Sequence, residues 1–326
     1  MSDYFLGIDG GGSKTRAVIV DASYQVLGTG EAGAANHFSV GAAVAAHNCA
    51  LAAQRALANA HEMDSSFEGA KVRSWGFGLA GVRREADTDR VRDALKAVCS
   101  LPFALETDVV AAHAGAFEGE TGIVVSGGTG AITFGADEFG ARVYADGWGP
   151  VLGDEGGGYW IGVEALRAVC RSLDGRSHPT YLTPLVLEFL EVETGDELVQ
   201  LVYAPDTTRD KIASIAKVVS RAAEEGVSEA VEIRARAAQA LSRGVRCVGR
   251  ALLQSRHERG APPVEMLISL RGGLFEDDFL RATVGFNATE AMVELKRDYL
   301  PISGWRVIKP LHDAAVGAAI LGQLSL

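Results

Sequence analysis

Glycine-rich turns beside acidic side chains are the parts of this sequence best suited to chemistry. The first such run starts at Asp9, continues through Gly12, Ser13 and Lys14, and ends at Thr15. Consecutive glycines let backbone amides converge on an anion because no Cβ stands in the way, and such nests hold phosphate oxygens. An acid at the end of the preceding strand can orient a hydrated magnesium ion. The run therefore predicts a phosphate-binding turn.

Three further glycine clusters follow the ends of predicted strands, at residues 127–130, 146–158 and 271–273. Because glycine is the default residue of tight turns, an ordinary turn is the alternative interpretation of each cluster. The first run is not a Walker A loop, since Ser13 intrudes before Lys14 and a β-branched strand follows where a helix is required. Two such hairpins, one in each half of the chain, could hold one triphosphate.

Carboxylate and amide side chains could carry out the remaining chemistry. Asp108 stands with Thr107 at the start of an alanine-rich helix, where the helix dipole favours the ionised carboxylate. A carboxylate there can accept the proton of an attacking hydroxyl group, although helix capping is the simpler role. Asp154 and Glu155 stand among glycines and can accept hydrogen bonds from two neighbouring hydroxyls, unless they only face solvent. Asn36 would add a donor and an acceptor.

The elements that must position these residues repeat in order along the chain. The predicted strands cover residues 4–9, 16–21, 25–30, 72–79, 103–106, 123–126, 131–135, 142–145, 264–270 and 305–308. The predicted helices cover residues 40–61, 84–99, 109–117, 159–173, 183–190, 209–224, 228–257 and 312–324. Three strands joined by turns open each half, so the second half repeats the first in kind. We expect two α/β domains that share a cleft. The helical region over residues 209–257 is expected to serve packing or dimer formation.

Composition and charge exclude several classes of protein. A chain of 326 residues allows one large or two medium domains, and a hydrophobic content of 48% excludes disorder. The net charge of -11 argues against nucleic-acid or acidic-membrane partners. The four cysteines are far apart, and no apolar window is long enough for a membrane span, which together favour a reduced, cytoplasmic protein.

Longer runs resemble a known family. The fifteen-residue run from Asp146 to Trp160 is the most specific, and with the Asp9 run and residues 128–130 it is similar to BadF/BadG-type ATPases and, within them, to N-acetylglucosamine kinases. The resemblance spans most of the chain and also includes residues 33–38, 106–108, 174–176, 272–273 and 313–319.

This resemblance implies the fold shared by actin, hexokinase and the Hsp70 ATPase. Each of two α/β domains, of the actin-like (ribonuclease H-like) kind, would hold a five-stranded mixed sheet with helices, and the two would flank a nucleotide cleft. Residues 1–117, joined by the final helix at about 313–326, would form one domain. Residues 118–312, with a helical insertion, would form the other.

The resemblance also implies roles for individual residues. Asp108 matches the catalytic aspartate, and Asp9 is expected to hold Mg²⁺ through water. The positions that contact the sugar in the family are matched by Asn36, Asp108, Thr129, Gly147, Trp148, Asp154 and Gly158. The positions that bind ATP or its phosphates are matched by Gly10, Gly11, Gly12, Ser13, Lys14, Thr15, Gly128, Thr129, Gly130, Gly272 and Gly273.

The activity implied is ATP-dependent transfer of the γ-phosphate to the 6-hydroxyl of an amino sugar, with N-acetylglucosamine as the first choice. Glucosamine and N-acetylmuramic acid are the alternative substrates. A different class is the ATPase activator of a radical dehydratase, which holds an iron–sulfur cluster through cysteines; the scattered cysteines count against it. A sugar sensor or an actin-like assembly protein is the third class, and Asp108 favours catalysis over both. The resemblance further suggests a homodimer.

Three positions depart from the family pattern. Ala131 stands where many relatives have serine, Phe38 stands where tryptophan is frequent, and residues 225–227 replace a common Gly-Asp pair. The first departure can alter phosphate contacts, the second the sugar pocket, and the third only packing.

Overall fold

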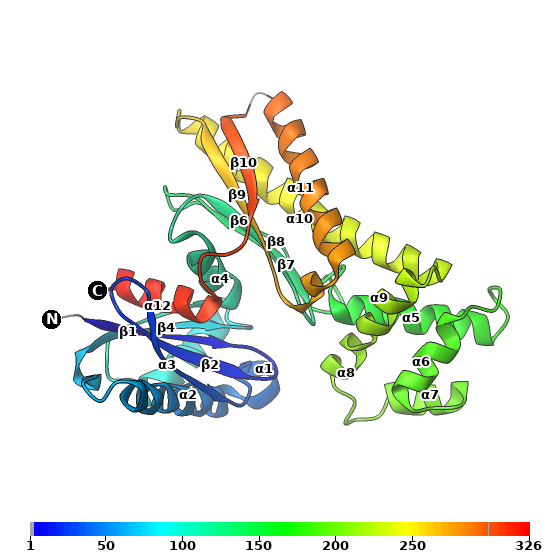
Figure 1. Cartoon of the computed structure of the whole chain (residues 1–326), viewed down its shortest axis with the longest axis horizontal. Helices are drawn as coiled ribbons and strands as arrows, with labels where there is room; N and C mark the ends of the chain where they lie inside the picture. Colours follow the sequence, from blue (N-terminus) through cyan, green and yellow to red (C-terminus); the bar gives the residue numbers. More distant parts are fainter. Residues whose placement is uncertain (1–2, 299) are drawn as a thin grey trace. The chain divides into compact units, whose positions relative to one another are not determined.

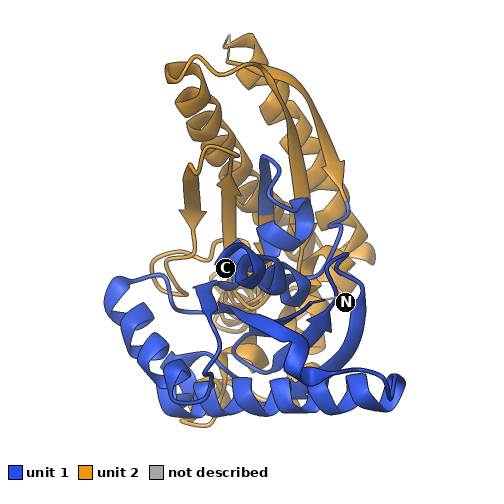
Figure 2. Cartoon of the chain, turned by 90° about the vertical axis from the view of Figure 1, so that its left-hand side faces the viewer, with its two compact units in different colours: residues 1–124, 309–326 blue, residues 125–308 orange. Residues whose placement is uncertain are grey.

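The chain folds into two compact units in the computed structural model, which describes residues 3–298 and 300–326 (Figure 1). One unit contains Met1–Val124 and Lys309–Leu326, and the other contains Val125–Ile308 (Figure 2). The expected domain borders, after residues 117 and 312, fall a few residues away from these.

Unit 1 is built on a five-stranded sheet with strand order β3-β2-β1-β4-β5. Strand β1 pairs antiparallel with β2 and parallel with β4, and β4 pairs parallel with β5. Its elements are β1 (Tyr4–Gly10), β2 (Thr15–Val20), β3 (Val26–Ala32), α1 (His37–Val40), α2 (Ala42–Met63), η1 (Gly69–Lys71), β4 (Val72–Leu79), α3 (Glu85–Lys96), β5 (Phe103–Thr107), α4 (Asp108–Phe117) and α12 (Ala314–Leu324).

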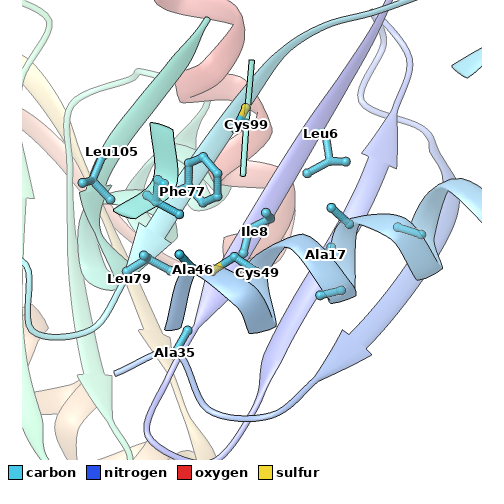
Figure 3. Packing of buried hydrophobic residues seen from close by; sticks show 14 of the residues in the cluster. Leu6, Ile8, Ala17, Ala35, Ala46, Cys49, Phe77, Leu79, Cys99 and Leu105 are labelled. Carbon is cyan, nitrogen blue, oxygen red and sulfur yellow. The ribbon is translucent and has the colours of Figure 1, made fainter. Parts of the chain in front are cut away.

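The main core of unit 1 lies between its sheet and α2. Ile8, Phe77 and Leu79 from the sheet belong to one buried cluster with Ala46 and Cys49 of α2 (Figure 3). The buried face of α2 is almost entirely alanine, so the helix backbone can approach the sheet closely. Burying the largest of these side chains stabilises the unit by about 1.5–3 kcal/mol each.

Helix α12 contributes to unit 1 although it ends the chain. Gly7 and Gly76 leave room for it, because a Cβ on either would overlap the backbone of α12. Ala315 and Ala319 then pack in the same cluster as Phe5 of β1. Small residues thus explain why residues 309–326 return to the first unit.

Unit 2 repeats the strand order of unit 1. Its sheet has the order β10-β9-β6-β7-β8, and β7–β8 pair antiparallel while β9–β10 pair parallel. Its elements, of which β6 begins just before the border, are β6 (Gly122–Gly127), β7 (Ala131–Ala136), β8 (Arg142–Asp146), α5 (Gly158–Leu173), α6 (Leu182–Leu190), α7 (Gly195–Val202), α8 (Arg209–Ala213), α9 (Ile215–Glu224), α10 (Ser228–Glu258), β9 (Val264–Arg271), η2 (Gly273–Glu276), α11 (Asp278–Arg297) and β10 (Ile302–Ile308). The predicted repeat of two five-stranded mixed sheets with helices is confirmed.

Several helices differ from the prediction. The single helix expected over residues 209–224 is two helices, α8 and α9, which meet at Ser214. Helix α11 was not predicted, because its buried stripe is diluted by alanine and its surface carries the exposed Phe279 and Phe286. Helices α1 and α7 were also not predicted. None of the described helices is long and apolar enough to cross a membrane.

Candidate active site

The turn between β1 and β2 leaves its tip open. Gly10 lies opposite Thr15 at the end of the ladder, and Gly11 N donates to the carbonyl oxygen of Lys14 at 3.0 Å. A Cβ built on Gly12 would meet no atom within 4 Å. An anion can therefore approach the backbone at Gly12, as an amide nest for phosphate requires.

The two cations of this hairpin have carboxylate partners. Lys14 Nζ lies 3.2 Å from Glu31 Oε1, and Arg16 Nη1 lies 3.0 Å from Asp313 Oδ2. The Lys14–Glu31 pair is largely exposed, and exposed pairs contribute only about 0–1 kcal/mol. Lys14 can therefore exchange Glu31 for a phosphate at little cost. Phosphate binding by Lys14 stays a prediction.

Asn36 is tied to the same turn by the backbone. The carbonyl oxygen of Gly11 accepts hydrogen bonds from Ala35 N at 3.0 Å and Asn36 N at 3.1 Å. Asn36 caps α1 because its Oδ1 accepts a hydrogen bond from Phe38 N at 3.0 Å. Its side-chain amide nitrogen is the group left to contact a ligand hydroxyl.

The residues next to Asn36 anchor this loop to unit 1. His37 is buried, with Nε2 3.4 Å from Asp87 Oδ1, and its ring centroid lies 4.1 Å from that of Phe38. Gly81 lets both rings approach, since a Cβ there would come within 3.1 Å of them. Phe38 is 62% exposed, so the aromatic position that departs from the family pattern presents its ring to the surface.

Asp108 is the first residue of α4. Thr107 is the N-cap and accepts a hydrogen bond from Val110 N, while Asp108 Oδ1 accepts one from Val109 N at 2.9 Å. Gly78 lets α4 pack close to β4, because a Cβ there would lie 3.7 Å from the Asp108 Cα atom and overlap the methyl group of Ala111. The predicted helix start is confirmed, and Asp108 lies on it half-buried.

The predicted groups of unit 1 meet at one edge of its sheet. Strands β1, β4 and β5 are parallel, so their carboxyl ends, which carry Asp9, Leu79 and Asp108, lie on the same side. Ligands of open α/β sheets bind beyond these ends. The glycine turn, Asn36 and both aspartates are thereby brought to one edge.

The second glycine turn, between β6 and β7, is held by helix α5. Gly128 N donates to Gly130 O at 2.9 Å within the turn. Gly158 N donates to Gly128 O at 2.8 Å, and Tyr159 N donates to Thr129 O at 2.9 Å. The first amides of α5 thus bind the turn, which places Gly158 next to Gly128 and Tyr159 next to Thr129.

Asp154 is buried beside this turn. It has the left-handed φ of 55°, and its Oδ1 accepts a hydrogen bond from Gly149 N while its Oδ2 accepts one from Arg209 Nη2, both at 3.2 Å. Burial raises the pKa of the Asp154 carboxyl, and Arg209 and the Gly149 amide partly oppose that rise. The charge of Asp146 raises the pKa of Asp154 further.

Asp146 shapes the loop that carries Asp154. Its Oδ1 accepts a hydrogen bond from Asp154 N at 2.7 Å, and its Oδ2 accepts one from Glu155 N at 2.9 Å. Next to it, Gly147 has a positive φ and packs against Ile132, where a Cβ would lie 2.5 Å from Cδ1. This scaffold role was not predicted, although an Asp-Gly pair at a strand end is a turn signal that points to it.

The same loop presents apolar side chains at its surface. Trp148 is 61% exposed, and Val151 and Leu152 are more exposed still. Trp148 is therefore not a core aromatic of unit 2. Its predicted contact with sugar stays a prediction.

Two residues of α8 reach the site of unit 2 and were missed by sequence reasoning. Arg209 pairs with Asp154, and Thr129 Oγ1 donates to Asp210 Oδ1 at 2.6 Å. No glycine or motif marks them, and the expectation of packing or dimer formation for residues 209–257 did not include these two contacts. In the sequence, Arg209 and Asp210 are marked only by being an adjacent cation and anion, which is a weak signal for a site.

Gly272 lies against the start of the second turn. It has a φ of 100°, and a Cβ there would overlap the carbonyl of Gly127. A Cβ on Gly273 would meet nothing within 4 Å. The Gly272–Gly273 bend and the turn after β6 therefore form one glycine-lined edge in unit 2.

The fold and these sites define an α/β protein of two repeated units, each with a glycine hairpin at its sheet edge. The sequence profile of the BadF/BadG/BcrA/BcrD ATPase family matches residues 6–322. The chain belongs to this family, and the predicted membership is confirmed.

Individual relatives carry sugar-kinase names. A Clostridium acetobutylicum protein named N-acetylmuramic acid/N-acetylglucosamine kinase is 27% identical over 321 residues, 98% of this chain and of its own. A Dictyostelium discoideum protein named N-acetyl-D-glucosamine kinase is 31% identical over 230 residues, 69% of this chain and 72% of its own. A solved Chromobacterium violaceum structure described as a candidate N-acetylglucosamine kinase matches with a TM-score of 0.72 at 24% identity over 98% of both chains. This structural likeness establishes the fold.

Proposed function

We propose that this protein is an ATP-dependent sugar kinase that phosphorylates the 6-hydroxyl of N-acetylglucosamine. The observation that carries the proposal is the sheet edge of unit 1, where a half-buried carboxylate at a helix start lies at the same edge as an open glycine turn and Asn36. The sugar-kinase names of two relatives support it.

Asp108 would act as the proton acceptor. The hydroxyl oxygen of the sugar attacks the γ-phosphorus, the bond from that phosphorus to the bridging oxygen of ADP breaks, and the hydroxyl proton passes to the Asp108 carboxylate. The helix dipole of α4 favours the ionised carboxylate that this step needs. A loose transition state asks little of the base, so an ordinary carboxylate suffices.

The glycine turns suit the phosphates of ATP. Gly12 in unit 1 and Gly128 and Gly273 in unit 2 all have empty space where a Cβ would lie. Asp9 is half-buried at the carboxyl end of β1 and offers the carboxylate oxygens that Mg²⁺ prefers, with water and phosphate completing the shell. Bound Mg²⁺ would neutralise developing charge on the phosphate oxygens.

Asn36 in unit 1 and Asp154 in unit 2 each present a polar group that suits a sugar hydroxyl. Asn36 offers its side-chain amide nitrogen, and Asp154 offers a buried carboxylate whose position is fixed by two hydrogen bonds. A sugar that lacks the matching hydroxyl leaves these groups unpaired, which costs about 1–3 kcal/mol for each. Selection among epimers follows from that cost.

N-acetylmuramic acid is the second candidate substrate. Arg209 is a half-exposed cation beside Asp154, and a lactyl carboxylate would find a partner there. The name of the Clostridium acetobutylicum relative includes this sugar. Comparing the two sugars in one assay decides between them.

The cysteines do not suit the activator of a radical dehydratase. An iron–sulfur cluster shared by two copies needs two accessible thiolates from each. Cys49 and Cys99 are buried, and burial raises the pKa of Cys49 to about 12. Cys247 is exposed and Cys170 is only partly so, on different helices, α10 and α5.

A coupled ADP-release assay over a panel of amino sugars and hexoses tests the proposal. N-acetylglucosamine should stimulate ADP release, and NMR of the product should place the phosphate on O6. Asp108→Asn should lower kcat by about 100-fold to 10,000-fold, the usual contribution of a positioned base.

Asp93→Asn is the matched control, because Asp93 is an exposed acid of the same unit that pairs with Lys96. It should retain wild-type activity. Absence of stimulation by any sugar, or full activity of Asp108→Asn, would show that the proposal is wrong.

A further inference from the structure

Helix α8 lies against the site of unit 2 because two glycines of α5 lack side chains. A Cβ on Gly162 would overlap the carbonyl of Ile212, and a Cβ on Gly158 would lie 3.3 Å from the Cβ of Ala213. The backbones of α5 and α8 are therefore in direct contact. This contact fixes where the first residues of α8 can reach.

The first two residues of α8 contact different parts of the site. Arg209 Nη2 lies 3.2 Å from Asp154 Oδ2, and its guanidinium carbon lies 5.6 Å from the centre of the Tyr159 ring. Asp210 Oδ1 accepts a 2.6 Å hydrogen bond from Thr129 Oγ1. Tyr159 donates its own amide to Thr129 O, so the loop, the turn and α5 all meet at α8.

We propose that Arg209 and Asp210 are positioning residues of the kinase site, with Arg209 orienting Asp154 for the sugar and Asp210 orienting the hydroxyl of Thr129. The inference rests on the proposed function. Neither residue needs to touch the reacting atoms, because each acts through the side chain that it holds.

The charges around Asp154 explain why the cation matters. Asp146, at the end of β8, places a negative charge near Asp154. Glu155 pairs instead with Arg243 of α10, whose Nη1 lies 3.8 Å from Glu155 Oε2. Arg209 is the positive group that bonds directly to the Asp154 carboxylate. Without it, burial and Asp146 both favour the protonated carboxyl, which accepts fewer hydrogen bonds from a sugar.

The test is steady-state kinetics of ADP release with N-acetylglucosamine for Arg209→Gln and Arg209→Lys. Arg209→Gln should raise KM for the sugar about tenfold while kcat changes less than about threefold, the pattern of lost ground-state binding. The acid limb of its kcat/KM profile should move to higher pH. Arg209→Lys keeps the charge and should restore part of the affinity and the wild-type acid limb.

Asp210→Ala and Asp210→Asn test the second half. Asp210→Ala removes the acceptor of the Thr129 hydroxyl and should lower kcat/KM about tenfold, whereas Asp210→Asn keeps an acceptor and should retain most of it. Arg221→Gln and Asp206→Asn are the matched controls, since both residues are exposed near α8 and Arg221 pairs with Glu225. Both controls should behave as wild type.

A further variant moves α8 while leaving Arg209 and Asp210 unchanged. Gly162→Ala should displace α8 and raise KM for the sugar as Arg209→Gln does. Unchanged KM and acid limb in Arg209→Gln, with an active wild type, would overturn the role of Arg209 alone. Equal loss in Asp210→Asn and Asp210→Ala would overturn the role of Asp210. A wild type that no sugar stimulates would instead remove the proposed function and this inference with it.

Discussion

The two units use the same strand order but support their glycine turns differently. In unit 1, the carbonyl of Gly11 binds the amides of Ala35 and Asn36, just before α1. In unit 2, the carbonyls of Gly128 and Thr129 bind the first amides of α5. Both turns are thus fastened to the helix start that follows the third strand of their sheet.

The difference lies in the loop between that third strand and the helix. Residues 33–36 make a short connection in unit 1, closed by the Asn36 cap. Residues 147–157 make a longer one in unit 2, shaped by Asp146 and supported from outside by Arg209. The two units therefore share a fold, but the glycine turn of unit 2 lies beside a buried carboxylate, Asp154, whereas the turn of unit 1 is held by a short capped connection. Four sets of variants test this comparison.

Gly130→Ala should have the largest effect on activity. Its Cβ would lie 2.5 Å from Asp154 Oδ2 and would push the carboxylate out of place. A misplacement of about 1 Å in a site costs about 100-fold, so we expect a loss of that size in kcat/KM for the sugar. Gly12→Ala is the counterpart in unit 1, where the Cβ meets nothing, and it should leave the melting temperature unchanged. If Gly130→Ala and Gly12→Ala had the same effect on the melting temperature, the two glycine turns would not differ in how tightly their surroundings pack against them.

Gly272→Ala should destabilise unit 2. Its φ of 100° disfavours a side chain, and the Cβ would overlap the carbonyl of Gly127. We expect the free energy of unfolding to fall by more than about 1 kcal/mol. The measurement is urea unfolding followed by circular dichroism, with Gly273→Ala as the control that should stay within about 0.5 kcal/mol of wild type. A larger loss of unfolding free energy in Gly273→Ala would show that the bend at residues 272–273 is not specific to the glycine at 272.

Asn36 variants should separate capping from sugar recognition. Asn36→Ala removes the cap of α1 and should lower the free energy of unfolding by about 1 kcal/mol, whereas Asn36→Asp keeps a good cap and should cost little. Both variants lose the amide donor and should raise KM for the sugar. If only Asn36→Ala raised KM, the role of Asn36 would be confined to the cap.

Asp154→Asn should change how stability depends on pH. Because burial raises the pKa of Asp154, the folded state holds the proton more tightly than the unfolded state. The resulting stability is fully present below the ordinary pKa of 3.8 and is lost as pH rises through the folded pKa. The free energy of unfolding of wild type minus that of Asp154→Asn should therefore fall through this window. Denaturant unfolding between about pH 3 and about pH 7 measures it, and a flat difference would contradict the raised pKa.

Local patterns predicted most of the architecture. Period-two and glycine-turn signals located the ten strands that residues 3–298 and 300–326 contain, since alternation and tight turns leave direct marks in sequence. Helix α11 left no such mark, because a helix packed on α10 needs only a weak apolar stripe. The start of α4 at Asp108 was predictable, since a cap and an alanine-rich run define it locally.

The sequence by itself determined the repeated order of strands and helices, the glycine turns and the family, because these depend on neighbours along the chain. Only the tertiary structure decided that Arg209 and Asp210 reach Asp154 and Thr129, which lie more than fifty residues away in sequence. Side-chain pairs of this kind depend on how closely α8 can approach α5. That approach is set by Gly162, whose missing side chain gains its meaning only when the two helices are packed together.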